Sequence, residues 1–419
     1  MHPLKKEDPE ARRSREGRGA LMVLVLLVVA LLAAAGFKAL SLLPGDWTEG
    51  SREAPVRPEL AAPAPALAPE VAASGPELAG EPEASDERPY DLNDQAIAAL
   101  EAGRLDEAVA LLEEATAARP DVATFGTNLG EAYLRRAQAR GKSGADGAYD
   151  DYAAALRWIE DPERRALVEE LLERSRRIRD EERDFVVEPT VHFTFRYDGS
   201  REGVTEGVER LKVLLEDTYQ EFGEQFRRRP VEAGEGRIEV VLYDAEGFDK
   251  VTGLGDWAGG VFDGKIRVPV EDLRSELRFA RVKGVLRHET AHAFTRSIGG
   301  ARVPAWLNEG VAQWLEDPAR RASDVGVARA RLASSTLFPL SRLNGNLVGW
   351  EDRAEVARAY DQALAFVDHL AVQYGPDLVF SMIAACRGGG VEGAAAHFKE
   401  RTLVDLDPVL GDLADSLTR

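Results

Sequence analysis

Two histidines stand four residues apart in this chain, His288 and His292, and Glu289 directly follows the first. Residues four apart lie on one face of an α-helix, so both imidazoles can reach the same cation. Neutral imidazole is a good zinc ligand, and Glu289 projects beside that face, where it can act as a general base on a metal-bound water. We therefore predict a helix over residues 271–298 that presents a zinc site and stops at Gly299–Gly300.

The residues around this H-E-x-x-H pattern are uncharged, except for Arg287 directly before His288. The alternative is a surface helix that happens to carry two histidines and a glutamate. A solvated face would show charged neighbours, and the uncharged positions here are Val285, Leu286, Thr290, Ala291, Ala293 and Phe294. The flanks therefore favour a buried, metal-binding helix.

An open catalytic zinc site needs a third protein ligand and leaves the fourth position to water. Downstream, residues 303–314 read VPAWLNEGVAQW, in which Pro304 suits a helix start and Glu309 lies 17 residues after His292. A loop through Gly299–Gly300 that leads into an antiparallel helix fits this spacing. Glu309 is the candidate third ligand, and Glu316 is the alternative.

The WLNEG run at 306–310 resembles the third-ligand helix of gluzincin metallopeptidases of the peptidase MA-like group. The resemblance covers about residues 185–400, and its strongest part is 285–314. It implies that His288, His292 and Glu309 bind Zn²⁺, in a thermolysin-like zincin fold whose sheet-edge strand holds extended peptide. The segment WAGGVF (257–262) looks like that edge, the alternative being a plain structural hairpin.

Two further positions follow from the same resemblance. Residues 354–370 are similar to the tyrosine-containing helix that follows the site, so Tyr360 would donate a hydrogen bond to the oxyanion, unless it is a packing tyrosine. Gln313 stands where these peptidases carry an acid that supports a histidine, which predicts an uncharged partner there. The remaining histidines carry no motif; among them are His192, His369 and His397.

Periodicity indicates the surrounding fold. Alternation over 191–197 and the apolar run 237–243 predict strands, a helix is expected over 203–226, and residues 259–268 read as a hairpin around Asp263–Gly264. We predict an α+β catalytic domain at 184–340, followed by a helical subdomain at 341–419.

The N-terminal part reads as a membrane anchor. Residues 1–19 form a basic tail with six Lys and Arg, and residues 20–37 are uncharged, long enough as a helix to span about 27 Å. The basic flank predicts a cytoplasmic tail and a single-pass inner (plasma) membrane anchor, with the bulk of the chain on the extracytoplasmic, periplasmic side. A signal peptide cleaved near 33–35 is the alternative. Residues 38–88 are rich in Pro and Ala and read as a disordered linker.

Residues 89–183 are rich in Ala and Leu and read as helices. The Leu129-Gly130-x-x-Tyr133 run resembles the start of a tetratricopeptide repeat, which starts repeats at 89 and 123, the second interrupted at 141–147, and puts Ala108 and Ala115 at small positions. A third helix over 162–179 would cap them. Such repeats would bind a protein partner, whereas a plain helical hairpin would have no binding role.

The composition limits the classes of partner and metal site that the chain can have. The chain carries 53 basic and 73 acidic side chains, net charge −20, which argues against a nucleic-acid partner because no basic field would attract phosphates. The single cysteine, Cys386, excludes an intrachain disulfide or a multi-thiolate metal site and reads as a small buried residue in a helix.

Taken together, the patterns predict a membrane-anchored zinc peptidase that hydrolyses peptide or protein substrates. The alternative is a non-catalytic, membrane-tethered repeat scaffold with a structural or vestigial zinc site. Glu289 favours the enzyme, because a structural zinc site has no use for a general base.

Overall fold

A computed structural model describes residues 87–418 apart from short gaps at 144–146, 231–235, 255–258, 346 and 348–349. The predicted tail and membrane segment, and all of the predicted linker except its last two residues, lie outside the described residues. Within the part that is described, the structure contains no helix long and apolar enough to cross a membrane.

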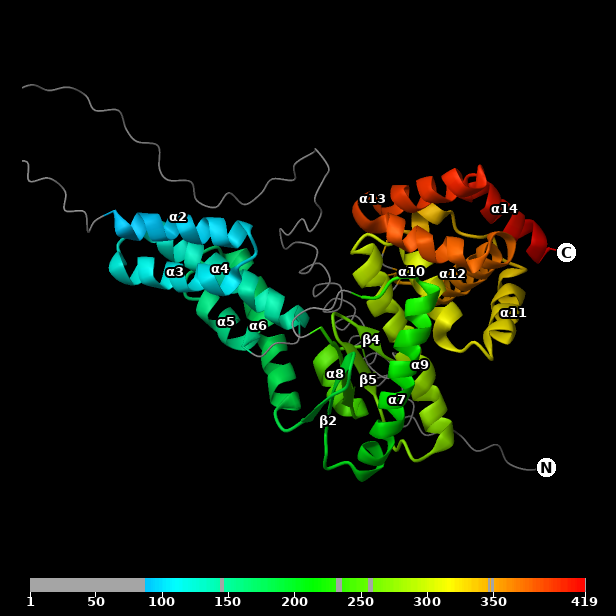
Figure 1. The fold of residues 1–419 in the computed structure, drawn as a ribbon, viewed down its shortest axis with the longest axis horizontal. Coiled ribbons are helices and arrows are strands. Elements are labelled where there is room, and N and C mark those ends of the chain that lie inside the picture. The colour runs from blue at the N-terminus through cyan, green and yellow to red at the C-terminus, as the bar shows by residue number, and fades with distance from the viewer. Residues whose placement is uncertain are drawn as a thin grey trace, which may run out of the picture.

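The first described segment is a series of helices in which each packs against the next (Figure 1). Its helices are α2 (Arg88–Glu101), α3 (Leu105–Ala118), α4 (Ala123–Ser143), α5 (Ala148–Ala155) and α6 (Pro162–Glu182). Ala108 and Ala115 are fully buried, and a Cβ on Gly130 would lie 2.8 Å from Cβ of Trp158. Small residues thus permit close helix packing here, as predicted, while the tetratricopeptide likeness stays a prediction.

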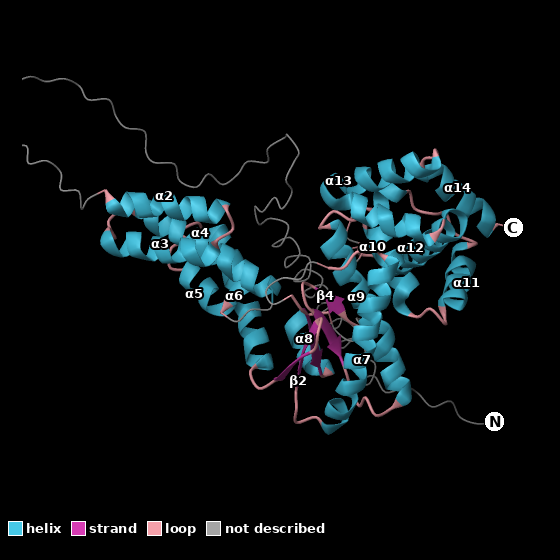
Figure 2. Ribbon diagram, viewed as in Figure 1, coloured by secondary structure: helices cyan, strands magenta, loops and turns pink. Residues whose placement is uncertain are grey.

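A small mixed sheet follows, seen between the helices in Figure 2. Its strands are β1 (Val186–Pro189), β2 (Phe193–Tyr197), β3 (Ile238–Tyr243), β4 (Val261–Phe262) and β5 (Ile266–Pro269), in the order β1-β2-β3-β5-β4. The three central strands are parallel, and the edge strands β1 and β4 are antiparallel to their neighbours. The expected strands and hairpin are present, whereas β1 was not predicted.

Two helices connect the strands, α7 (Glu202–Gln225) between β2 and β3 and α8 (Ala245–Thr252) after β3. The chain then becomes helical: α9 (Glu276–Gly299), α10 (Ala305–Glu316), α11 (Arg321–Leu332), the 3₁₀ turn η2 (Leu340–Leu343), α12 (Arg353–Tyr374), α13 (Pro376–Thr402) and α14 (Leu406–Leu417). The described chain is therefore a mostly helical α+β structure, as expected.

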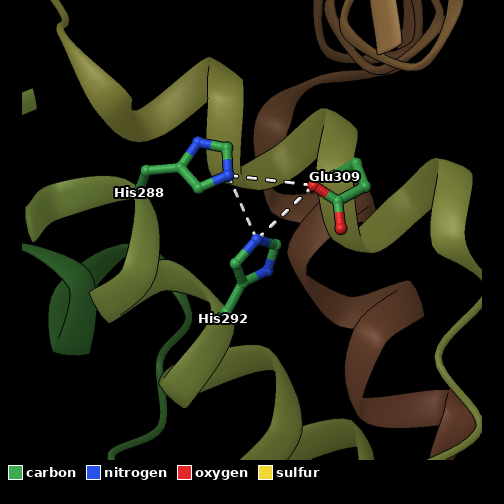
Figure 3. A group of neighbouring side chains, drawn as sticks. All are labelled: His288, His292 and Glu309. Carbon is green, nitrogen blue, oxygen red and sulfur yellow. Dashed lines mark hydrogen bonds and ion pairs between the residues drawn. The ribbon is translucent and has the colours of Figure 1, made fainter. Parts of the chain in front are cut away.

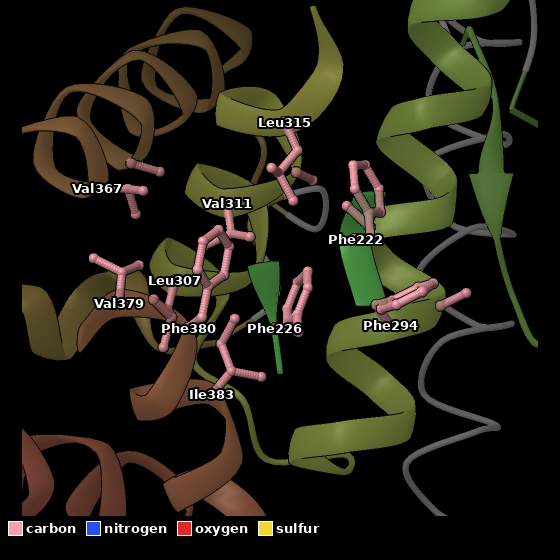
Figure 4. Close-up of a cluster of buried hydrophobic side chains, with 14 of the residues drawn as sticks. Phe222, Phe226, Phe294, Leu307, Val311, Leu315, Val367, Val379, Phe380 and Ile383 are labelled. Atoms are coloured by element: carbon pink, nitrogen blue, oxygen red, sulfur yellow. The ribbon is translucent and has the colours of Figure 1, made fainter. Parts of the chain in front are cut away.

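One hydrophobic core joins the sheet to the C-terminal helices. It runs from β2 to α14 and is continuous across residue 340, where the sequence suggested a boundary. Figure 4 shows its centre, where Phe226 lies between Phe294 of α9 and Phe380 of α13, with Val311 of α10 beside Phe380. Cys386 is buried in α13, as predicted. The core fixes α9 and α10 relative to each other, which matters because both carry candidate site residues.

The helix with the two histidines begins at Glu276, five residues later than predicted. Residues before it form a turn in which Asp272 accepts a hydrogen bond from the amide of Arg274 at 3.0 Å. Ser275 then caps the helix by accepting from the amide of Arg278. The sequence-based start was too early because the Asp and Ser side chains bind backbone amides locally and so delay the helix.

Candidate metal centre

His288 and His292 lie on one face of α9, with ring centroids 4.8 Å apart. The opposite face, including Leu286 and Phe294, is buried in the core and holds the helix in place. At its C-terminal end, Arg387 of α13 donates a 2.9 Å hydrogen bond to the carbonyl of Ile298. Packing on one side and capping at the end therefore orient both imidazoles before any ligand binds.

Glu309 reaches the histidines from α10. Pro304 provides the extended N-cap of this helix, and Thr295 of α9 donates to Asn308 of α10 at 2.5 Å. On the other side of α10, a Cβ on Gly310 would lie 2.5 Å from the carbonyl oxygen of Ala363 in α12. The glycine lets α10 lie close to α12, with the Glu309 side chain turned toward α9.

Three ligand atoms converge at this point, as Figure 3 shows. The two Nε2 atoms of His288 and His292 are 3.1 Å apart. Oε2 of Glu309 lies 3.7 Å from Nε2 of His288 and 3.5 Å from Nε2 of His292. Ligand atoms about 2.1 Å from a tetrahedral zinc ion are about 3.4 Å from one another. The observed triangle therefore fits a zinc ion in both spacing and ligand type, and these residues form the one His/Cys/Asp/Glu group suited to a metal among the described residues.

The charges around the triangle favour a cation. Burial lowers the pKa of His288, but its contacts with Glu309 and Glu316 outweigh this and raise it to about 10. For Glu309, burial would raise the pKa, yet the two histidines hold it below its usual range. With Glu289, three carboxylates lie around the two imidazoles, and a divalent ion would relieve the repulsion among the carboxylates.

Glu289 occupies a buried position between α9 and the sheet edge, with 6% of its surface exposed. A Cβ on Gly260, directly before β4, would lie 3.2 Å from Oε1 of Glu289. Burial, together with the charges of Glu309 and Glu316, raises the pKa of Glu289. The carboxyl group therefore stands beside β4, the edge strand at which the sequence predicts an extended peptide.

The residue that supports a histidine differs from the expectation. Gln313 does not contact an imidazole; its Nε2 donates to the carbonyls of Glu309 and Tyr360, at 3.2 and 3.1 Å. Instead, Oε2 of Glu316 lies 3.3 Å from Nδ1 of His288. Glu316, considered from the sequence as an alternative metal ligand, thus lies behind His288. Its place seven residues after Glu309, two turns along one face of α10, was the available signal.

Arg287, the one charged neighbour of the motif, fixes the end of α10 that carries Glu316. Its side chain is 5% exposed, and its Nε donates at 3.1 Å to the carbonyls of both Leu315 and Glu316. Its two terminal nitrogens donate to the carboxylate of Glu221 in α7, at 2.8 and 2.9 Å. Arg287 therefore links three helices directly behind the candidate ligands, a role that sequence reasoning missed.

Tyr360 also belongs to this group. It lies on α12, packed at the edge of the core. Burial, and then the negative charges of Glu309 and Glu289, raise the pKa of its hydroxyl above the usual range, and the hydroxyl is within hydrogen-bonding reach of Glu309. The phenol therefore stays protonated and available as a donor at the candidate metal centre.

The other histidines among the described residues lie elsewhere. His192 pairs with Glu216 at 2.6 Å, His369 is buried in α12, and His397 contacts Ser381 at 2.8 Å. None joins the metal-suited group among the described residues. Of the predicted edge segment 257–262, the first two residues lie outside the described residues and the last two form β4.

Comparison of the whole chain with curated proteins finds no match. A family model, however, matches a stretch shorter than half of the chain. That stretch begins at the last residue of β3 and runs through most of α13, so it holds all the residues of the candidate metal centre. Residues 243–398 match the model described as Peptidase MA superfamily, which supports a zincin-like peptidase domain in this part of the chain.

Proposed function

We propose that the chain is a zinc-dependent peptidase of the gluzincin type, with His288, His292 and Glu309 as the zinc ligands. The observation that carries the proposal is the triangle of two imidazole nitrogens and one carboxylate oxygen, 3.1–3.7 Å apart. Two histidines and a glutamate leave one tetrahedral position open, as a catalytic site requires. The match to the peptidase superfamily model supports the substrate class, peptides or proteins.

Zinc held there would lower the pKa of a water molecule and polarise the peptide carbonyl. Glu289 would accept the proton from the attacking water and later deliver it to the leaving amine. Its position beside β4 supports this role, because peptide paired with the sheet edge would pass next to its carboxyl group. Tyr360 would donate a hydrogen bond to the oxyanion of the tetrahedral intermediate.

The test is hydrolysis of unfolded casein by the purified full-length chain, with its zinc content measured in the same preparation. We expect about one zinc per chain and cleavage that a chelator abolishes and zinc restores. Glu289→Gln should keep the zinc and lose nearly all activity, whereas Glu309→Gln should lose zinc as well. Glu392→Gln, which changes an exposed glutamate on α13, is the control and should match the wild type.

Two results would contradict the proposal. One is full activity in a clean preparation of the Glu289→Gln variant, which would remove the general base assigned here. The other is a zinc-loaded wild-type chain that cleaves none of several unfolded proteins, which would favour the scaffold alternative.

We further propose that residues 20–37 anchor the chain in the inner (plasma) membrane, with the folded part on the periplasmic side and the helical segment 89–183 available to a protein partner. The uncharged run and its basic flank support the anchor. Resistance of the membrane-bound chain to alkaline extraction, with protease access only from the outer side, is the expected result. Release of the chain by alkali would contradict the anchor.

A further inference from the structure

A cluster of four charged side chains and one tyrosine joins α6, the last helix of the N-terminal helical segment, to the β4–β5 hairpin. We call it the junction cluster; its members are Arg174, Glu182, Tyr243, Asp263 and Arg267. Figure 1 shows α6 running from the helical segment to the sheet. The hairpin is the one whose β4 strand lies beside Glu289.

The centre of the junction cluster is buried. Arg267 on β5 is 2% exposed, and its Nη1 donates to Oε1 of Glu182 at 2.9 Å. Tyr243 of β3 donates to the same carboxylate and accepts from Arg267. Glu182 itself is 7% exposed. Buried charges are stable only when paired, so this arrangement fixes the end of α6 against the sheet.

The outer part of the junction cluster forms hydrogen bonds to the turn of the hairpin. Asp263, the first residue after β4, accepts from Arg174 of α6 at 2.8 Å and from Arg267 at 3.3 Å. Arg267 is also the residue that pairs with Val261 across the hairpin. Both α6 and β5 therefore hold the two residues of β4 in place through contacts of Arg174 and Arg267.

Apolar contacts also connect α6 to the hairpin. Ile178 of α6 packs in a cluster with Tyr243 and Phe248, and Val261 of β4 packs against that cluster as well. A two-residue edge strand has little stability of its own. In the described residues its outer edge carries no partner strand, so its position depends on the groups behind it.

We propose that α6 holds the β4 edge in the position that binds peptide, with Glu182 and Arg174 as positioning residues that act through Arg267 and Asp263. The inference rests on the proposed peptidase function, because it gives the β4 edge its substrate. It assigns the N-terminal helical segment a task within the catalytic unit, beyond any partner it binds.

The test compares two variants of the full-length chain with a matched control. Arg174→Ala removes a half-exposed contact and should leave the fold intact, whereas Glu182→Gln disrupts the buried centre. Arg176→Ala is the control, since its ion pairs are with Glu173 and Asp180 of the same helix. Circular dichroism verifies the helical fold of each variant.

The first measurement is amide hydrogen exchange of residues 261–267, which needs no catalytic activity. Arg174→Ala should speed exchange about two- to fivefold, and Glu182→Gln about tenfold or more. Arg176→Ala should leave it unchanged. Equal exchange of the hairpin in all three variants would overturn the proposal that α6 holds it.

The second measurement is casein hydrolysis, in which Arg174→Ala and Glu182→Gln should both raise KM, Glu182→Gln more than Arg174→Ala, and change kcat less. Faster exchange with unchanged KM would overturn the link to peptide binding. A wild-type chain that is zinc-loaded but inactive would contradict the proposed function itself, and the exchange result would still decide whether α6 holds the hairpin.

Discussion

Oε2 of Glu316 lies 3.3 Å from Nδ1 of His288, on the side of the ring away from the candidate metal position. A carboxylate that accepts from Nδ1 fixes the tautomer and the orientation of the imidazole, leaving Nε2 free to bind the ion. We predict that Glu316→Gln lowers zinc affinity about tenfold or more, because loss of such partners typically costs that much. Competition with a chromophoric chelator measures the change.

The control for this prediction is Glu392→Gln, an exposed change on α13 that leaves the site untouched. The loss of zinc affinity should be smaller in Glu316→Gln than in Glu309→Gln, because the second change removes a metal ligand and the first removes only the support of one. Zinc affinity in Glu316→Gln equal to that of the control would show that the carboxylate has no positioning role.

Tyr360→Phe tests the proposed oxyanion donor. The substitution removes one hydroxyl and keeps the ring, so packing on α12 should be preserved. Since a single lost oxyanion donor typically costs about a hundredfold in kcat, we expect a fall of that order with little change in KM and normal zinc content. Tyr374→Phe, at the end of the same helix, should retain wild-type kinetics. Normal kcat in Tyr360→Phe would identify Tyr360 as a packing residue.

The sequence could predict the metal-binding face because the spacing of His288 and His292 leaves only one geometry for a helix. Predicting the position of Glu309 required a return helix, which Pro304 and the glycines at the end of α9, Gly299 and Gly300, indicate. The spacing of Glu316 from Glu309 was a signal, but the support of His288 could not be fixed from the sequence, because it depends on how Arg287 contacts the end of α10. That contact joins residues 28 and 29 positions apart through side chain and carbonyl, and no local pattern encodes it.

In the fold, too, local patterns predicted some elements, and tertiary contacts decided the others. Alternation identified β2, and the apolar run identified β3, since both have buried faces. Strand β1 was missed because it lies at the sheet edge and three of its four residues are exposed, which leaves no alternation to read. The junction cluster was invisible for another reason: Arg174, Glu182 and Arg267 look like ordinary surface charges until the chain brings them together.

Acid should weaken the helical segment through Glu131. Burial would raise the pKa of this carboxyl group, but Arg164 and Arg135 outweigh that and lower it below its usual value. A lowered folded-state pKa means stability that is complete above the unfolded value, about 4.3, and is lost as pH falls through the folded one. Glu131→Gln should therefore reduce stability at pH 7 and flatten its fall below pH 5, as urea unfolding would measure. An unchanged pH profile would contradict the assignment.

Gly310 follows Glu309, and the structure explains why no side chain fits there. A Cβ would lie 2.5 Å from both the carbonyl oxygen of Ala363 and Cγ2 of Val367 in α12. Alanine favours a helix over glycine by about 1 kcal/mol, but overpacking against backbone costs about 1–3 kcal/mol. We predict that Gly310→Ala destabilises the chain and, by pushing α10 away from α12, also shifts Glu309 and lowers zinc affinity.

The matched control for Gly310→Ala is Gly326→Ala on α11, where an added Cβ meets nothing within 4 Å. Because only helix propensity changes there, the free energy of unfolding of this variant should rise by up to about 1 kcal/mol, and it should bind zinc normally. Opposite signs for the two glycines in urea unfolding would show that close contact, and not glycine flexibility, sets the position of Glu309. If both variants gained stability and bound zinc equally well, the spacing of α10 and α12 would not control the metal centre.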